Sequence, residues 1–570
     1  MKKNILRIFI LLIMGTATVN AQSQAQIFNE IDERVYLHVN TTTFLTGETL
    51  LYSFYNLKKS AETTSEISKI GYVQILDPMG NILETQKVAL ESGRGQGDFF
   101  ISSNMDTGEY KVIAYTKWML NETPDAFYQI KIAVINPFKA PDASMIVESD
   151  STTQKTVVPS TKNISDVQDL SVIGLQKEVY APREKVGLNI EELPMGTYSV
   201  SVRKTDELEF HSPSTVKNFS DLKNSKTVNA NDKNILPELR GEIISGKITS
   251  KNDESVDNKT IALSIPGVSF TLHFVNTRSD GSFMFTLDKV PGKSELIVQV
   301  FDENKENYEL ELDQHTAQNT FFSFENNLQL NRDLKEAIEQ RSTAMQIENA
   351  FYQNRKDSIS GFGKKKAFYS PIAVEYKLDD YTRFPTVAET LIEIVPDVYF
   401  NRKNGIYTID IRDHNNSDRA IFGKTLVLVD GLVLQDVNEL FAFSANDIES
   451  IEVIYEGYVY GPKVFNGLVN FKTKKQNFNS EAKGDYLLKT EIVRPDAEKI
   501  YFQPDYSAEN QKRIPDYRYQ LLWLPKMMLG TEKKEINFYT SDVEGEFEIA
   551  IEGFSENGKP ISVRKTFSVK

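Results

Sequence analysis

Short apolar stretches, each ended by turn-forming residues, recur along most of the chain. Early examples are residues 50–55, 71–76 and 110–115, and the turns between them carry Gly47, residues 77–81 and residues 107–109. Glycine and asparagine tolerate the positive φ that tight turns require. Runs of this length between closely spaced turns are typical of β-sandwiches. The pattern predicts a mainly β protein made of several sandwich domains.

The length of 570 residues predicts several domains, since a common domain has about 100–150 residues. Changes in composition place the boundaries. We expect β-sandwiches at 27–138 and 236–318, a partial sandwich at 167–235, a Ser/Thr/Pro-rich linker at 139–166, a helical connector at 325–366, an α+β domain at 367–478 and a C-terminal β-domain at 483–570.

Residues 1–21 have the pattern of a signal peptide. Lys2, Lys3 and Arg7 precede the apolar run 8–14, and small residues end the segment at Ala21. The run falls short of the roughly 20 residues that a membrane-spanning helix needs. We therefore expect an exported chain that begins near Gln22 and lies in the periplasm or at the outer membrane, with the cell surface as an alternative.

The composition excludes several kinds of protein. The chain has no Cys, so it has no disulfide, no thiolate metal site and no acylated lipoprotein cysteine. Its net charge of −15 argues against nucleic acid as a partner. The mean hydropathy of −0.37 predicts a water-soluble chain that does not span the membrane once the signal peptide is removed.

The first predicted sandwich resembles a known domain family. The resemblance lies in residues 36–38 (YLH), 44–49 (FLTGET), 107–110 (TGEY) and 114–119 (AYTKWM). These segments are similar to the type-2 macroglobulin domain of alpha-2-macroglobulins, and the tyrosine-rich strand resembles secreted multidomain proteins of Bacteroidota. The resemblance implies a β-sandwich over about the first fifth of the chain.

Two later segments continue the β pattern. Residues 180–186 repeat the approach to the first sandwich, but 170–203 offers too few strands to bury both faces of a sandwich. We expect the strands of 484–570 to complete it. Residues 243–248, 280–285 and 296–300 resemble the carboxypeptidase-regulatory-like fold. Residues 331–356 have no Gly or Pro and predict a helix.

The most specific motifs lie between residues 370 and 475. They are 425–431 (TLVLVDG), 446–453 (NDIESIEV), Tyr460-Gly461 and 466–474 (NGLVNFKTK). In this order they resemble the plug domain of TonB-dependent receptors. The resemblance assigns structural or interaction roles to Asp430, Gly431, Asp447, Ile448, Glu449, Ser450, Tyr460, Gly461, Asn466 and Gly467. Two alternating aromatic residues, Tyr455 and Tyr458, are candidate contact residues, with core packing as the alternative.

The chain departs from that receptor family in two ways. A receptor encloses its plug in a barrel of many strands, yet only residues 475–570 follow the motifs, so we expect no transmembrane barrel. The approach to the motifs carries Lys364, Lys365 and Lys366, so we find no apolar TonB box. We expect the plug-like domain to fold alone, with the helix at 331–356 covering one face.

No motif indicates catalysis, a cofactor or a metal. The five histidines are far apart in sequence, and neither His-Glu-x-x-His nor Gly-x-Ser-x-Gly occurs. The Gly-Lys-Ser/Thr triplets at 292–294 and 423–425 lack the first glycine of a phosphate loop. We expect no enzyme activity, no cofactor and no small-molecule substrate; a hydrolase built from surface carboxylates is the remaining catalytic alternative.

The leading functional hypothesis is an exported binding or scaffold protein. Its plug-like domain would dock on an outer-membrane protein or on a transport or secretion complex. The alternative is an alpha-2-macroglobulin-like protein that interacts with proteases. Such a protein would lack the thioester, because the thioester requires a cysteine.

Overall fold

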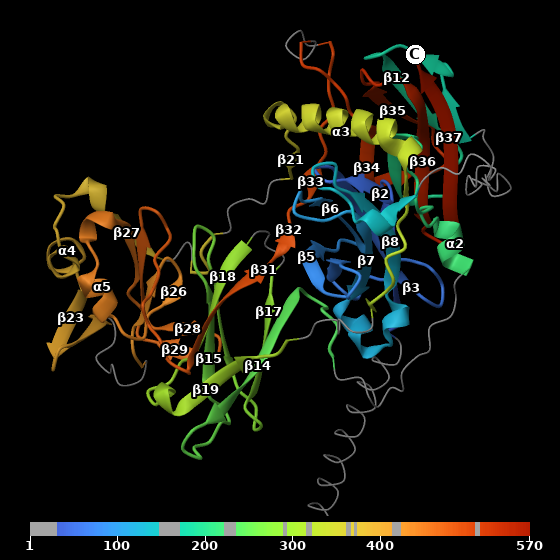
Figure 1. The fold of residues 1–570 in the computed structure, drawn as a ribbon. Helices are drawn as coiled ribbons and strands as arrows, with labels where there is room; N and C mark the ends of the chain where they lie inside the picture. The colour runs from blue at the N-terminus through green and yellow to red at the C-terminus, as the bar shows by residue number, and fades with distance from the viewer. Residues whose placement is uncertain are drawn as a thin grey trace, which may run out of the picture. The chain divides into compact units, whose positions relative to one another are not determined.

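The computed structural model describes residues 31–147, 172–221, 235–288, 293–314, 322–360, 366–369, 373–412, 423–507 and 513–570. The predicted signal peptide and linker residues 148–166 lie outside this range. The described chain is mainly β, which confirms the predicted fold class (Figure 1). Contacts divide it into unit 1 (1–241, 315–360 and 495–570) and unit 2 (242–314 and 361–494).

Unit 1 begins with a sandwich of two sheets, which we call the first sandwich. One sheet has the order β1 (Glu33–Val39), β3 (Thr49–Lys58) and β6 (Arg94–Phe100). The other has the order β2 (Thr43–Leu45), β8 (Tyr128–Ile135), β7 (Gly108–Thr116), β4 (Ile70–Leu76), β5 (Ile82–Ala89) and β32 (Pro495–Asp496). Apolar side chains of both sheets form one buried core, as alternating strands predict.

A second sandwich in unit 1 combines strands from distant parts of the chain. One sheet has the order β10 (Ile173–Leu175), β12 (Lys185–Ile190) and β35 (Lys534–Tyr539). The other has the order β11 (Val179–Tyr180), β37 (Pro560–Val569), β36 (Gly545–Ser555), β13 (Gly196–Lys204) and β34 (Gln520–Leu529). Residues 173–204 thus pair directly with C-terminal strands and share their core.

Polar contacts join the two sandwiches of unit 1. The Tyr55 hydroxyl donates to the Glu552 carbonyl at 2.9 Å, and the Ser53 hydroxyl donates to the Pro525 carbonyl at 2.7 Å. Helix α2 (Val216–Asp221) adds Phe219, whose ring lies 5.0 Å from that of Tyr36. Unit 1 is therefore one packed body.

The structure corrects the predicted role of the helical connector. Helix α3 spans only Lys335–Ala350, and its contacts assign it to unit 1, whereas residues 367–478 belong to unit 2. The buried Arg341 fixes it: the guanidinium bonds Glu48 at 2.7 Å and Asp206 at 3.0 Å. Apolar contacts add to this anchor, since Met345 is buried and Ile338 packs against a small apolar cluster that includes Leu45. Two short pairings flank it, β20 (Leu330–Asn331) with β9 (Ile146–Val147), and β21 (Ser358–Ile359) with β33 (Lys499–Ile500). Residues 146–147 of the predicted linker are therefore β-paired.

Unit 2 contains the third sandwich. One sheet has the order β17 (Ser282–Leu287), β14 (Glu242–Ser250) and β19 (Tyr308–Leu312). The other has the order β16 (Thr271–Asn276), β15 (Thr260–Ile265), β18 (Lys293–Val300) and β31 (Leu487–Val493). The predicted boundary at 483 is therefore wrong, because β31 completes this sandwich and not the C-terminal domain.

The rest of unit 2 is an α+β part, residues 366–478. Its sheet has the order β22 (Val374–Lys377), β27 (Ile448–Ile454), β30 (Leu468–Thr473), β25 (Leu426–Val429) and β26 (Leu432–Val433). Helices α4 (Val387–Ile394) and α5 (Asn438–Ala442) and the hairpin of β23 (Val398–Lys403) and β24 (Ile406–Ile411) share a core with one sheet face. A second hairpin comprises β28 (Tyr458–Tyr460) and β29 (Lys463–Phe465). Thr386 begins α4 with a capping box to Glu389.

Candidate functional site

The first motif residue, Asp430, is buried and stabilises the fold through hydrogen bonds. Its carboxylate accepts hydrogen bonds from the Thr473 backbone N–H at 2.7 Å, the Thr473 hydroxyl at 2.6 Å and the Phe478 backbone N–H at 3.0 Å. These bonds tie the turn after β25 to the end of β30. All three partners lie within the fold, so the buried carboxylate has its hydrogen-bonding needs satisfied internally.

Two motif glycines lie against the sandwich of unit 2. Gly431 has φ +84°, and a Cβ there would lie 2.1 Å from the Phe270 ring. Gly461 has φ +58°, and its Cβ would lie 2.9 Å from the Phe274 carbonyl oxygen. Phe270 and Phe274 share a buried cluster with sheet residues such as Leu428. The sandwich supplies Ala262, Phe270, Leu272 and Phe274 to this cluster, and the independent folding of 367–478 stays a prediction.

The hairpin of β28 and β29 places its tyrosines inward. The Tyr460 hydroxyl donates to the Leu272 carbonyl at 2.5 Å, and the Tyr460 ring stacks on Phe368 at 4.1 Å. Burial raises the pKa of Tyr460. The Tyr458 ring stacks against Tyr460 at 6.2 Å. The residue between them, Val459, is exposed instead, because alternate residues of a strand point to opposite faces.

Tyr455 is also engaged within the fold. Its hydroxyl lies 2.8 Å from the Tyr376 hydroxyl and donates to the Pro396 carbonyl at 2.9 Å. Burial and the Tyr376 hydroxyl raise the pKa of Tyr455. Both candidate contact aromatics therefore pack within unit 2 in this structure.

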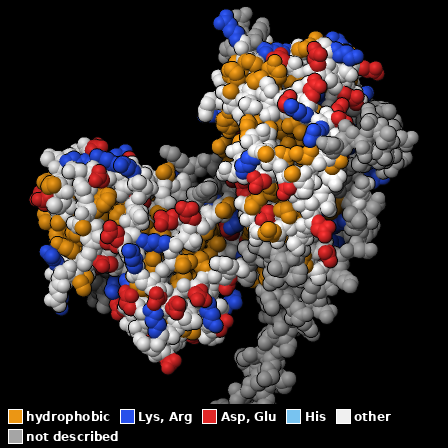
Figure 2. Space-filling view, in the orientation of Figure 1, with side chains coloured by type: hydrophobic (Ala, Val, Ile, Leu, Met, Phe, Trp, Pro, Cys, Tyr) orange, Lys and Arg blue, Asp and Glu red, His pale blue; other side chains and the backbone are white. Residues whose placement is uncertain are grey.

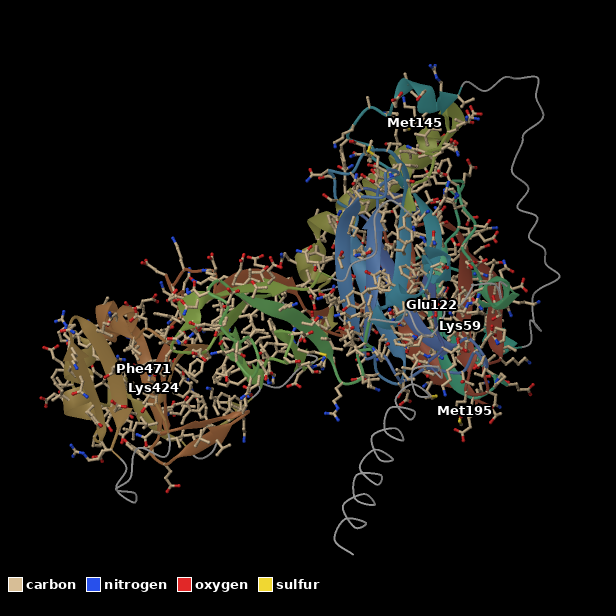
Figure 3. The ribbon with its side chains drawn as sticks, turned by 90° about the horizontal axis from the view of Figure 1, so that it is seen from below. Lys59, Glu122, Met145, Met195, Lys424 and Phe471 are labelled. Atoms are coloured by element: carbon tan, nitrogen blue, oxygen red, sulfur yellow. The ribbon has the colours of Figure 1, made fainter. Side chains whose placement is uncertain are left out.

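The remaining motif residues serve the sheet or face solvent. Ile448 and Ser450 are buried at the start of β27, whereas Asp447 and Glu449 are exposed. The Asn466 amide donates to the Ile411 carbonyl at 3.3 Å. Gly467 has φ +84°, and a Cβ there would lie 2.4 Å from the Ile454 carbonyl oxygen. The structure thus brings three of the motifs together in one sheet and its turns, and places the Tyr460-Gly461 motif in the separate β28–β29 hairpin. In Figure 3 the labelled Phe471 lies within this part.

The surface of the α+β part away from these turns carries exposed apolar side chains. Ile392 of α4 is 68% exposed, and Ile406 at the tip of the β23–β24 hairpin is 60% exposed. Beside that tip, Tyr407 stacks on Phe441 at 4.0 Å, and Arg402 lies over the Tyr407 ring at 4.9 Å. The motifs contain none of these residues, so motif reading did not single them out. The buried positions of α4 are 387, 390, 391 and 394. Ile392 is an apolar residue off that buried face, and this position was the available sign of the surface in the sequence.

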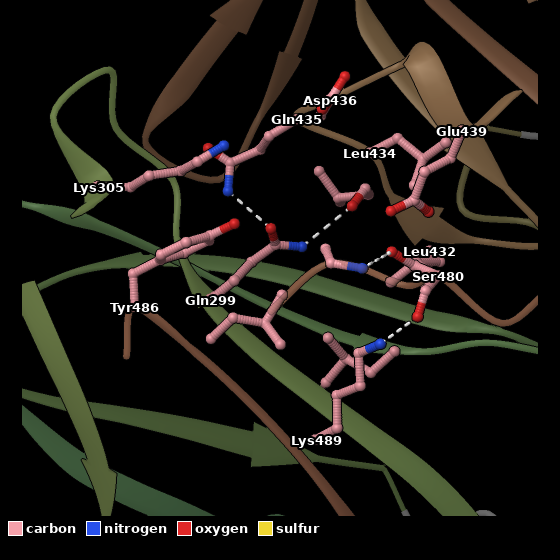
Figure 4. A pocket seen from close by; sticks show the side chains of 14 residues that line it. Gln299, Lys305, Leu432, Leu434, Gln435, Asp436, Glu439, Ser480, Tyr486 and Lys489 are labelled. Carbon is pink, nitrogen blue, oxygen red and sulfur yellow. Dashed lines mark hydrogen bonds between the residues drawn. The ribbon is translucent and has the colours of Figure 1, made fainter. Parts of the chain in front are cut away.

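One cavity lies inside unit 2, between the sandwich and the α+β part (Figure 4). Its volume is about 20 Å³, close to that of a single water. Gln299 donates to the Val433 carbonyl at 3.0 Å, and Gln435 donates to Gln299 at 2.6 Å. Lys489 donates to the Ser480 carbonyl. Strong hydrogen bonds across so small a space hold the two parts together and leave no room for a substrate.

A serine–histidine pair lies in unit 1, and no sequence motif indicated it. Ser199 Oγ is 2.6 Å from His38 Nδ1 and also accepts from the Tyr55 hydroxyl at 2.9 Å. The Glu552 carboxylate nearby accepts from Arg564 at 3.0 Å. Burial raises the pKa of Glu552 and lowers the pKa of His38 to about 3. A nucleophile must reach its substrate, and both Ser199 and His38 are buried. The cluster is a structural joint between the two sandwiches.

The part of the chain that the structure describes contains no group of three His, Asp or Glu residues arranged to hold a metal ion. It also has no helix long and apolar enough to cross a membrane.

No family model and no curated protein matches this chain. Among solved structures, alpha-2-macroglobulin from Salmonella reacted with methylamine is 9% identical, with a TM-score of 0.24 over 95% of this chain and 40% of that one. Escherichia coli alpha-2-macroglobulin activated by porcine elastase is 8% identical, with a TM-score of 0.24 over 94% and 44%. Dimeric latent PorU from Porphyromonas gingivalis is 8% identical, with a TM-score of 0.16 over 50% and 33%. The chain spans less than half the length of these structures, and its function must be argued from its own residues.

Proposed function

We propose that this chain is an exported, non-catalytic binding or scaffold protein of the outer membrane. Residues 367–478 form a plug-like domain that docks on an outer-membrane barrel or on a transport or secretion assembly. The observation that carries the proposal is that three of the four motifs form the neighbouring strands β27, β30 and β25 of one five-stranded sheet, while Tyr460-Gly461 lies in the β28–β29 hairpin. Asp430 and the glycines at 431, 461 and 467 all have positive φ there, as a motif defined by its turns requires.

The packing of unit 2 favours docking over insertion. A receptor plug is enclosed by its barrel, but here the turns at Gly431 and Gly461 are covered by Phe270 and Phe274 of the sandwich. Val459 of the β28–β29 hairpin is exposed, and two further exposed apolar side chains, Ile392 and Ile406, lie away from these turns. Helix α4 and the β23–β24 hairpin therefore form the docking surface of this proposal.

Site-specific crosslinking tests the proposal. A photo-crosslinking phenylalanine analogue is placed at Ile392, at Ile406 or, as a control, at Val268, which is 60% exposed on the sandwich of unit 2. In intact cells, positions 392 and 406 should each crosslink to an outer-membrane protein, and position 268 should not. Fractionation of the same cells should place the chain with the outer membrane. Crosslinks to soluble periplasmic proteins alone, or none at all, would refute outer-membrane docking.

A separate experiment with the purified chain tests the protease-interacting alternative. A protein that captures proteases should form a stable complex with an added protease after cleavage of its own chain. Incubation with trypsin and with elastase, followed by electrophoresis, should give no retained protease if the docking proposal is right.

A further inference from the structure

The tip of the β23–β24 hairpin presents apolar and cationic side chains together. Its turn residues Asn404 and Gly405 have φ of +53° and +83°, and positive φ at both positions is typical of the tight two-residue turn of a hairpin. The turn sets Lys403 opposite Ile406, which is 60% exposed. Figure 2 shows Lys and Arg side chains beside hydrophobic ones on the surface where Figure 1 labels α4 and β23. The turn therefore holds a cation and an isoleucine side by side at the surface.

A second cation of the tip, Arg402, rests on a column of aromatic rings. Its guanidinium carbon lies 4.9 Å from the centre of the Tyr407 ring, and that ring stacks on Phe441 at 4.0 Å. Phe400 lies 5.0 Å from Phe441, and the Tyr407 backbone N–H donates to the Asn438 side chain at 2.8 Å. Because the guanidinium is already positioned by this column, it loses less conformational entropy when a partner binds.

The charge at the tip is positive. Both cations are exposed, and neither forms an ion pair with a carboxylate among the described residues. The acidic residues Asp397 and Asp410 lie at the other end of the hairpin, and Asp436 and Glu439 line the cavity of Figure 4. Arginine binds a carboxylate through two parallel hydrogen bonds, and Arg and Tyr are enriched among the residues that carry most of the binding energy of interfaces. The tip therefore complements an acidic surface that also offers an apolar side chain.

We propose that this tip binds an acidic segment of a partner protein, in which Asp or Glu side chains flank a leucine or a phenylalanine. One carboxylate accepts two hydrogen bonds from Arg402, a second pairs with Lys403, and the apolar side chain packs on Ile406. The inference rests on the proposed function and deepens it, because the hairpin belongs to the proposed docking surface and the acidic segment belongs to the docking partner.

Fluorescence anisotropy with the full chain tests the proposal. The probe is a labelled peptide of alternating Asp and Leu residues, and the matched peptide has Lys in place of Asp. The net charge of −15 favours the Lys peptide in any non-specific binding, so tighter binding of the Asp peptide reports a local cationic site. The Asp peptide should bind with an affinity that falls as salt increases, and the Lys peptide should bind about tenfold more weakly or not at all.

Variants connect the binding to the tip. Arg402→Glu, Lys403→Glu and Ile406→Ser should each weaken binding of the Asp peptide about tenfold, with no change in melting temperature. The matched controls are Lys475→Glu, an exposed lysine outside the hairpin, and Val268→Ser, which like Ile406 is 60% exposed. Both controls should bind the peptide as the wild-type chain does. Equal binding of the two peptides, unchanged binding in the three tip variants, or no binding at millimolar concentration would each overturn the proposal.

Crosslinking in cells separates this inference from the docking proposal. With the photo-crosslinking analogue at position 406, Lys403→Glu should reduce the yield of the outer-membrane product about tenfold, and Lys475→Glu should leave it unchanged. Full yield in Lys403→Glu would overturn the acidic segment and leave docking intact. No product in the wild-type background would refute docking, and the peptide measurements then decide alone whether the tip binds an acidic segment. A dimer in sedimentation that is lost in Ile406→Asp would also overturn the inference, because the occupant would then be a second copy of this chain.

Discussion

The Asp430 carboxylate accepts the backbone N–H of Thr473 at 2.7 Å, which links two motifs separated by more than forty positions in the sequence. The same carboxylate holds the Phe478 N–H at 3.0 Å. The motif that suggested an interaction site is thus held together by an internal bond. The docking proposed for this part of the chain would therefore use residues outside these turns.

Asp430→Ala should destabilise unit 2 strongly. The substitution removes three hydrogen bonds and leaves two buried backbone N–H groups without acceptors, so we expect a loss of about 2–4 kcal/mol. The matched control is Asp447→Ala, another motif aspartate, which is exposed and should change stability by less than about 0.5 kcal/mol. Urea unfolding of both variants measures the difference. Equal stability of the two variants would mean that the hydrogen bonds of Asp430 do not stabilise unit 2.

Some of this arrangement was predictable from sequence. The alternating runs predicted sandwiches, and the shortage of strands in 170–203 suggested that the C-terminal segment completes them. Alternation fixes which residues are buried but not which strand pairs with which, so β31 was assigned to the wrong domain. The inward direction of Tyr458 and Tyr460 depends on Phe274 and Phe368, which come from distant segments. The site on α4 and the β23–β24 hairpin has no motif at all.

Gly431→Ala should cost much more than Gly405→Ala. Both glycines have φ near +84°, at +84° and +83°, but a Cβ at 405 meets nothing within 4 Å, whereas one at 431 meets Phe270 at 2.1 Å. Backbone strain alone should therefore cost about 1 kcal/mol at Gly405. Gly431→Ala should add at least about 1–3 kcal/mol for overpacking. Thermal unfolding compares them, and Phe270→Ala should reduce the excess in the double variant. An equal loss at both positions would show that the sandwich does not press on this turn.

Arg341→Met should release helix α3 from unit 1. The substitution removes the Arg341 guanidinium from both Glu48 and Asp206, so the cost should be about 3–5 kcal/mol. Lys335→Met on the same helix breaks a pair whose members are 79% and 67% exposed, and should cost about 0–0.5 kcal/mol. Limited proteolysis should cut residues 335–350 in the Arg341 variant first. Equal protection of that segment in both variants would contradict an ionic anchor.

The joint around His38 should make unit 1 sensitive to acid. His38 contacts the Ser199 hydroxyl at 2.6 Å and the Trp523 ring at 5.2 Å, with Arg564 as the charged group that opposes its protonation. Burial lowers its pKa from the ordinary 6.5 to about 3. An unfolded chain takes up a proton near pH 6.5 and the folded chain does not, so stability falls as pH decreases below 6.5 towards 3. Between pH 7.5 and 5 the loss from His38 should be about 2 kcal/mol.

A variant that lacks His38 isolates this effect. Burial raises the pKa of Glu552, so the folded state holds that proton to higher pH, and its contribution has the opposite sign over the same window. Total pH dependence is therefore a poor measure, and the difference between the wild-type chain and His38→Gln is the useful one. Denaturant unfolding at pH 7.5, 6.5, 5.5 and 5 should show that the wild-type chain loses about 2 kcal/mol more than the variant over this range. Parallel pH profiles for the two proteins would show that His38 is not held neutral in the folded joint.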